Sequence, residues 1–126
     1  MNASSQTLSG VRPLHLSPQA LRERNEQSYR STCVVHGLPE STHIAVLATE
    51  SSVLVTATDI DVLAEWLYVT RGPVTETVLP WGQTTYTLHA STWSDSPRFP
   101  VVPVHVSVTV PSDAPIMHEI AAAVTR

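Results

Sequence analysis

The sequence predicts an α+β fold built from two βββα units that follow an N-terminal helical arm. One observation is an internal repeat: residues 53–59 open an apolar segment that ends in Val-Thr-Arg at 69–71, and residues 106–113 lead into a segment with the same ending at 124–126. The other is periodicity, since apolar residues alternate with polar ones in short runs and recur at helical spacing after each run. We therefore expect each unit to be an antiparallel meander followed by a helix.

A chain of 126 residues is long enough for one domain with its own core. Residues 1–16 are polar with scattered prolines and leucines, which predicts a flexible segment. The remainder is expected to form a single α+β domain, residues 17–126, with the arm helix at 17–30, repeat one at 31–72 and repeat two at 73–126.

The arm helix and the first strand are predicted from local signals. Ser17 and Pro18 suit the N-cap and the first position of a helix whose apolar face is thin. Such a helix either docks as an arm or stays solvated. A β-rich run at 32–36, which ends at Gly37, is interpreted as the first strand of repeat one.

The rest of repeat one is a predicted hairpin, with strands at 43–49 and 52–58, followed by a helix. The hairpin register gathers the apolar residues on one face, with Ile44, Val46 and Ala48 opposite Ala57, Val55 and Val53. The helix is expected to begin at Thr58 or Asp59 and to stop at Gly72. Its buried stripe consists of Ile60, Leu63, Ala64 and Leu67.

Repeat two has predicted strands at 74–79, 84–92 and 101–110. Pairing the last two places His89 opposite His105 on a face rich in hydroxyl groups. The same pairing forms a dry face, on which Leu88 lies opposite Val106 and Ala90 opposite Val104. The last helix is expected to be capped by Ser112 or Asp113, with Pro115 in its first turn.

Composition narrows the classes of function. Charged residues make up 14% of the chain, and the net charge is −4. All seven cations are arginines, and we attribute the absence of lysine to the codon bias of a GC-rich genome. Because phosphate neutralisation needs clustered cations, this balance disfavours nucleic-acid binding. No signal peptide or membrane-spanning apolar run is present, so we expect a cytoplasmic protein without membrane contact.

The sequence lacks residues that metal sites, nucleophilic enzymes and nucleotide-binding proteins require. His89 and His105 could bind a metal or sense pH, but no third ligand is predicted, and two exposed histidines explain the pair better. Cys33, His36 and His43 do not have a zinc-finger spacing, and Cys33 is the only cysteine. The chain also lacks a nucleophile elbow, a P-loop and a GxGxxG motif. We therefore expect no metal, no other cofactor and no enzymatic activity.

Aromatic residues at turns are the predicted contact surface. Trp81 falls on a predicted turn and Trp93 at a strand end, and with Phe99 they are expected to form a patch that binds a partner. The complete set of candidate partner-binding residues is Trp81, Trp93, Phe99, His89, His105, Arg22, Arg24 and Arg30.

Two resemblances accompany these elements. The passage Val55-Thr56-Ala57-Thr58-Asp59 and the later Tyr86-Thr87-Leu88 resemble segments of small α+β proteins of unknown function from high-GC actinobacteria, their phages and plasmids. That resemblance covers about half of the chain and implies no catalytic residue. The doubled meander with a helix is similar to Whirly and PUR-type single-strand nucleic-acid binders, which implies oligonucleotide binding on a sheet face.

The sequence therefore favours a non-enzymatic interaction or regulatory protein that forms a homodimer or binds one protein partner. The alternative is a single-stranded nucleic-acid-binding module that uses Trp81, Trp93, His89 and the N-terminal arginines. A third hypothesis is a small enzyme or metal protein centred on His89 and His105.

Overall fold

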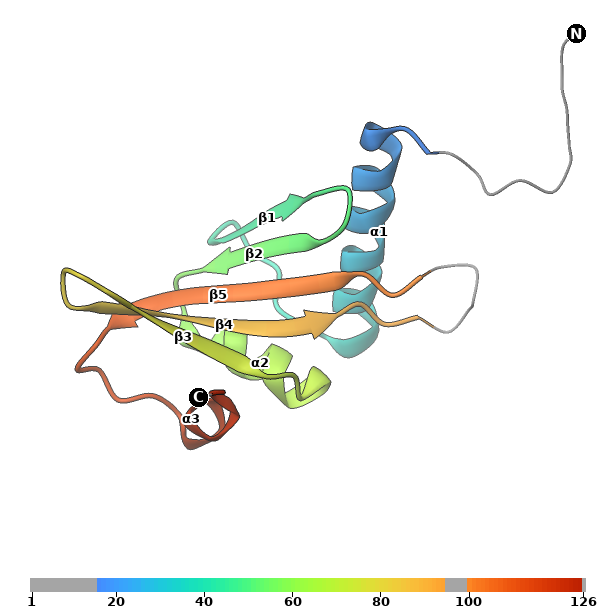
Figure 1. The fold of residues 1–126 in the computed structure, drawn as a ribbon. Helices are drawn as coiled ribbons and strands as arrows, with labels where there is room; N and C mark the ends of the chain where they lie inside the picture. Colours follow the sequence, from blue (N-terminus) through green and yellow to red (C-terminus); the bar gives the residue numbers. More distant parts are fainter. Residues whose placement is uncertain (1–15, 95–99, 126) are drawn as a thin grey trace, which may run out of the picture.

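A computed structural model describes residues 16–94 and 100–125 of the chain, which form a five-stranded mixed sheet and three helices (Figure 1). The α+β class predicted from the sequence is confirmed, and both halves of the chain contribute to one sheet. The elements are α1 (Pro18–His36), β1 (Ile44–Ala48), β2 (Val53–Ala57), α2 (Ile60–Thr70), β3 (Val74–Leu79), β4 (Gln83–Ser91), β5 (Pro103–Pro111) and α3 (His118–Ala123).

The strand order in the sheet is β1-β2-β5-β4-β3. Neighbouring strands are antiparallel except β2 and β5, which run parallel at the centre. The order is therefore not a simple meander, because β5 lies between β2 and β4. A parallel pair requires a long crossover, and here the chain between β2 and β5 includes α2, β3 and β4.

Both predicted hairpin registers are confirmed. Val46 lies opposite Val55 in the β1–β2 pair, and Leu88 lies opposite Val106 in the β4–β5 pair. His89 is directly opposite His105, as predicted. Alternation along a strand has a period of two, so a slip by one residue would move apolar side chains to the solvent.

The strand predicted at 32–36 is wrong, because those residues form the last turns of α1. The helix begins after the N-cap Ser17, as predicted, but continues until Gly37 takes the left-handed conformation and ends it. Thr32 and Cys33 are both 1% exposed, so their β propensity is overridden by burial against the rest of the protein. In the described chain, the first half thus contributes two strands rather than three.

The predicted cap of the last helix is also wrong. Ser112 and Asp113 belong to a turn closed by the Ala114 N–H and the Pro111 carbonyl, 3.0 Å apart. The residue before a proline is disfavoured in the helical conformation, and Pro115 follows this turn directly. The helix α3 therefore starts only after Met117, without a side-chain cap.

Helices α1 and α2 pack on one face of the sheet, and α3 packs beside α2 (Figure 1). The centre of this layer is Trp66 of α2, which is fully buried and stacks on Tyr29 of α1 with ring centroids 5.8 Å apart. Beneath them lies a fully buried row of β5 that includes Val104, Val106 and Val108. The helix predicted as an arm is therefore part of the hydrophobic core.

The end of α2 depends on a close approach between backbones. Arg71 adopts the left-handed conformation with φ of 55°, and its N–H bonds to the Leu67 carbonyl. At Gly72, a Cβ atom would collide with the backbone carbonyl of His89. The predicted stop at Gly72 is thus close to the observed end of the helix. A glycine is required at this position because any side chain would collide with the backbone of His89.

Some sequence predictions fall outside the described residues. The predicted flexible segment lies there apart from Leu16, and so does Phe99 of the aromatic patch. Over residues 16–94 and 100–125, none of the helices combines the length and the hydropathy that crossing a bilayer requires.

Candidate functional site: the open face of the sheet

The sheet presents to the outside a face that no described helix covers, called the open face below. Strand registers place the residues that alternate with the buried ones on this face. Away from the ends of β3, β4 and β5, they are, from β1 across to β3, Ala45, Leu47, Leu54, Thr56, His105, Ser107, Thr109, Thr85, Thr87, His89, Thr75 and Thr77. No Asp, Glu or Arg holds an outward position on the five described strands.

The hydroxyl groups of the open face are linked in pairs across neighbouring strands. Thr85 and Thr109 hydroxyls lie 2.7 Å apart, and those of Thr87 and Ser107 lie 2.9 Å apart. These pairs restrict the rotamers of β-branched or short side chains that have few torsions to lose. The result is a polar surface without formal charge whose groups are already oriented.

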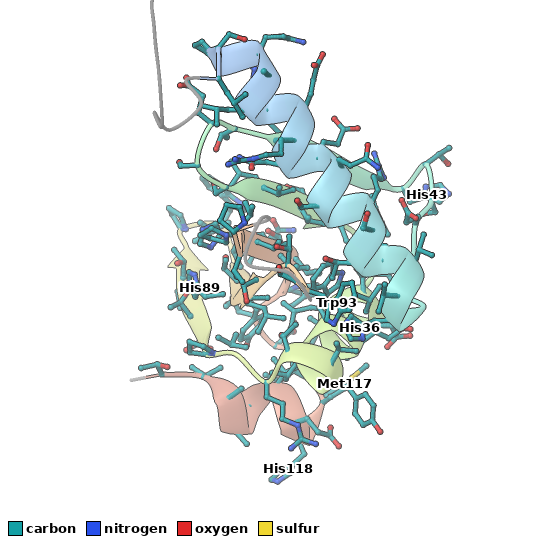
Figure 2. All side chains as sticks on the ribbon, turned by 90° about the vertical axis from the view of Figure 1, so that its right-hand side faces the viewer. His36, His43, His89, Trp93, Met117 and His118 are labelled. Atoms are coloured by element: carbon teal, nitrogen blue, oxygen red, sulfur yellow. The ribbon has the colours of Figure 1, made fainter. Side chains whose placement is uncertain are left out.

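The two predicted histidines continue the same pattern. The Nδ1 atoms of His89 and His105 are 3.0 Å apart, and the Nε2 atom of His89 lies 3.0 Å from the Thr75 hydroxyl. One imidazole must donate and the other accept, so the contact requires at least one neutral ring. Burial, and then the charge of His89, lowers the pKa of His105 below its ordinary value. Figure 2 shows His89 on the side of the sheet away from α1.

A metal site is not assembled around these rings. Across the described part of the chain, no three metal-ligating side chains gather. The neighbours of the pair are threonine and serine hydroxyls, which are poor ligands for zinc. His36 and His43 are far apart in Figure 2, and Cys33 is buried, where desolvation raises the pKa of its thiol.

The predicted aromatic patch is not formed by the two tryptophans that the structure describes. Trp81 lies on the turn before β4, and Trp93 follows the end of that strand. The nine residues of β4 separate them by about 30 Å. Trp93 instead lies beside the end of α1 (Figure 2). Its backbone N–H donates to the Thr32 hydroxyl over 2.9 Å.

The candidate arginines lie on α1, not on the open face. Arg30 pairs with Glu40 at 2.7 Å and with Glu26 at 3.6 Å, and Arg22 lies 4.0 Å from Glu50. The Nε atom of Arg24 is buried. Because carboxylates compensate two of these cations and the third is partly buried, α1 does not form the basic stripe that phosphate binding needs.

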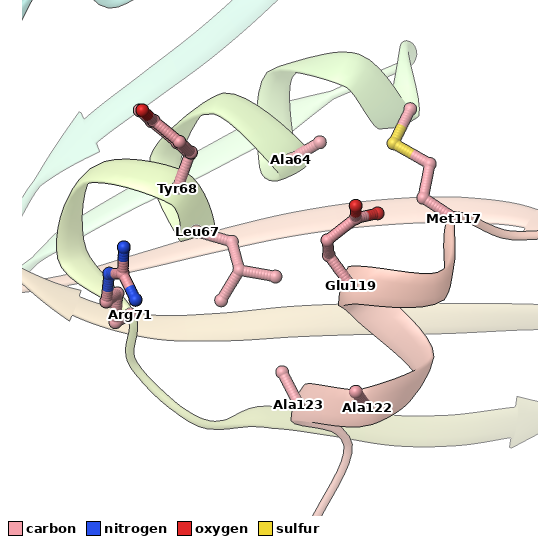
Figure 3. Close-up of a pocket in the computed structure, with 8 residues that line it drawn as sticks. All are labelled: Ala64, Leu67, Tyr68, Arg71, Met117, Glu119, Ala122 and Ala123. Atoms are coloured by element: carbon pink, nitrogen blue, oxygen red, sulfur yellow. The ribbon is translucent and has the colours of Figure 1, made fainter.

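One groove was not predicted from the sequence. It lies between α2 and α3, has a volume of about 590 Å³, and is lined by Ala64, Leu67, Tyr68, Arg71, Met117, Glu119, Ala122 and Ala123 (Figure 3). Its floor is apolar, and Arg71 and Glu119 stand on opposite walls. The exposed Tyr68 was the available signal, since a large aromatic residue on the outer side of a helix often marks a contact.

No protein-family model matches this chain, and no curated protein or solved structure resembles it significantly. We therefore infer its function from the side chains themselves.

Proposed function

We propose that this chain is a non-enzymatic interaction or regulatory protein whose open face binds another protein. The observation that carries the proposal is the absence of charged residues from the outward positions of all five described strands. Solvent-exposed sheet faces tolerate charged side chains, whereas the buried centres of protein interfaces are depleted in them. We accordingly propose a partner whose contacting surface also lacks formal charge, because a buried charge would find no counter-charge here.

A catalytic function has less support. The groove between α2 and α3 offers neither a serine, a cysteine nor a histidine among its lining residues. His89 and His105 hydrogen-bond to each other and to Thr75, and no carboxylate among the described residues orients them. Origin from a high-GC bacterium or its phage, and location in the cytoplasm, stay predictions that we retain with this proposal.

The alternative of single-strand nucleic-acid binding is disfavoured by two observations. Binding of this kind combines a basic groove with aromatic side chains on which bases stack. Among the described residues, the open face carries neither arginine nor an aromatic ring other than imidazole. Trp81 and Trp93 lie at opposite ends of β4 rather than together.

A paired-variant experiment tests the proposal. Thr109→Glu adds one negative charge to the exposed part of the open face, and Ser31→Glu adds the same charge to an exposed position of α1. Each tagged chain would be used to recover partners, and a recovered protein would then be purified and titrated against all three chains. We expect Thr109→Glu to weaken binding at least tenfold and Ser31→Glu to leave it unchanged, since only the first charge is desolvated at the interface.

A fluorescence titration with single-stranded oligonucleotides supplies the opposing test. Oligonucleotide affinity that falls steeply with salt would show phosphate binding and would overturn the protein-interaction proposal. Equal loss of partner binding in both variants would show that the effect comes from net charge rather than from the open face.

A further inference from the structure

The two edges of the sheet differ in how they are protected. At the β3 edge, the chain's own C-terminal residues cover the strand start, because Val124 bridges to Val74 and the Thr125 N–H donates to the Val74 carbonyl over 2.8 Å. Pro73 and Pro80 also flank that strand. Prolines and covering segments are devices that prevent another strand from adding to an edge.

At the β1 edge, the Ile44 N–H at the strand start donates to the Ser41 carbonyl over 3.2 Å, but no described segment covers the edge from Ala45 to Ala48. Its sequence, Ile44-Ala45-Val46-Leu47-Ala48, contains no charge and no proline, and its register with β2 has no bulge. The Thr49 N–H bonds to the Ser52 carbonyl at the hairpin end, which fixes the alternation of inward and outward backbone groups. The N–H and C=O groups of Val46 and Ala48 therefore point to the free edge.

Helix α1 extends past this edge. The Asn25 amide donates to the Thr49 carbonyl at the end of β1, and from there the helix runs inward to Thr32 and Trp93. Leu21 is on the same side of α1, one turn earlier, and is half-buried. One turn advances a helix by about 5.4 Å, close to the spacing of about 4.8 Å between strands, so Leu21 lies over the position that a sixth strand would take. Figure 1 shows the first turns of α1 beyond β1.

We propose that the β1 edge pairs antiparallel with β1 of a second copy of this chain, so that two sheets join into one. A two-fold axis at Val46 aligns the two strands and pairs the Val46 N–H of each copy with the Val46 carbonyl of the other, while the Ile44 N–H keeps its bond to the Ser41 carbonyl of its own chain. On the inner face, Ile44 then lies opposite Ala48 of the second copy, beneath the overhanging Leu21. On the open face, Leu47 lies beside Ala45 of the second copy and next to Leu54 of its own chain.

The occupant is a second copy because the strand is complementary to itself. Rotation about the two-fold axis at Val46 places small residues of one copy opposite large residues of the other. It also brings His43 of each copy beside the Thr49–Glu50 turn of the other, so that an imidazole lies near a carboxylate. A two-fold interface of this kind is closed, so it yields a dimer rather than a fibre. The proposal does not depend on what the open face binds.

Sedimentation equilibrium on the full chain tests this interface, over about 10 to about 500 µM, because a small interface associates weakly. We expect the wild-type mass to approach that of a dimer as concentration rises. Leu47→Lys places on this edge the residue that natural edge strands use against pairing, and we expect dissociation to become at least tenfold easier. Val78→Lys, at an exposed position of the other edge strand, is the matched control and should dimerise like the wild type.

A cysteine variant tests the position of the axis. Residues that face each other in a hydrogen-bonded antiparallel pair have Cα atoms about 5.5 Å apart, within the range of a disulfide. Oxidised Val46→Cys should therefore form a covalent dimer, while Val78→Cys should not, and the native Cys33 is buried and will not interfere. A wild-type chain that stays monomeric, a dimer that Leu47→Lys leaves intact, or the absence of the Val46→Cys crosslink would each overturn the proposal. Loss of a protein partner from an intact dimer would count only against the open-face function.

Discussion

At the scale of single residues, the most informative contact is that between His89 and His105. Their Nδ1 atoms are 3.0 Å apart on a face without formal charge, so neither imidazolium would find a carboxylate beside it there. Burial and the neighbouring ring lower the pKa of His105. The hydrogen bond between the two rings therefore forms only when at least one ring is neutral, and protonation of both rings at acidic pH breaks it.

This geometry predicts the pH dependence of stability. The unfolded chain takes up a proton at His105 near pH 6.5, its ordinary pKa, whereas the folded chain does so only at lower pH. Below about pH 6.5 the unfolded state binds more protons, so the free energy of unfolding should fall as the pH is lowered toward 5. Urea unfolding at pH 7.5 and at pH 5 measures this loss.

The variant His105→Thr, which suits a strand, should reduce the loss of stability between these two pH values. His118→Gln, at an exposed position at the start of α3, should retain the loss found in the wild type. If His105→Thr shows the same pH dependence as the wild type, the pair does not control acid stability.

At the scale of elements, the buried hydroxyl of Thr32 is one of the links between α1 and the sheet. Thr32 donates to the Ser28 carbonyl over 2.8 Å and accepts from the Trp93 N–H over 2.9 Å, which joins the end of α1 to the end of β4. Thr70 of α2 makes the same bond to the residue four positions earlier, the Trp66 carbonyl, but bonds to no other element of the described chain.

This difference predicts unequal effects of the same substitution. Thr32→Val preserves the shape of the side chain but leaves the Trp93 N–H without its acceptor, and should lower the free energy of unfolding by about 1–2 kcal/mol. Thr70→Val loses only a bond within its own helix and should change stability by less than about 0.5 kcal/mol. Chemical denaturation of both variants makes the comparison, and equal losses would show that the link between α1 and β4 contributes nothing.

At the scale of the whole molecule, α1 completes the core instead of acting as a detachable arm. Tyr29 is fully buried and stacks on Trp66 with an angle of 8° between the ring planes. Asn25, Thr32 and Cys33 are buried along the same helix. Any partner or second copy therefore meets a molecule in which α1 is already docked.

The stacked pair predicts a large effect for one tyrosine and a small effect for another. Tyr29→Ala should lower the free energy of unfolding by about 3–5 kcal/mol, because it opens a cavity in the core. Tyr68→Ala removes the same atoms from a side chain that is 79% exposed and should cost less than about 0.5 kcal/mol. Thermal unfolding measures both, and a stable Tyr29→Ala variant would restore the interpretation of α1 as an arm.

The sequence by itself determined the elements whose signals are local. Alternation specified the β1–β2 and β4–β5 registers, and with them the contact of His89 with His105, because a slip of one residue would expose apolar side chains. Helical spacing located α2 and two of its buried residues, Leu63 and Leu67, whereas Ile60 and Ala64 of the predicted stripe are only partly buried. The candidate open face follows from these registers, although its lack of charge becomes a surface property only when the strands are assembled.

Only the tertiary structure decided the rest. Residues 32–36 have strand propensity but lie in α1, because Thr32 and Cys33 gain more from burial in the core than they lose in helix propensity. The insertion of β5 between β2 and β4 depends on contacts between segments distant in the chain, which local periodicity does not encode. The same long-range order leaves β1 at an unguarded edge, covers the start of β3 with the C-terminal residues, and separates Trp81 from Trp93.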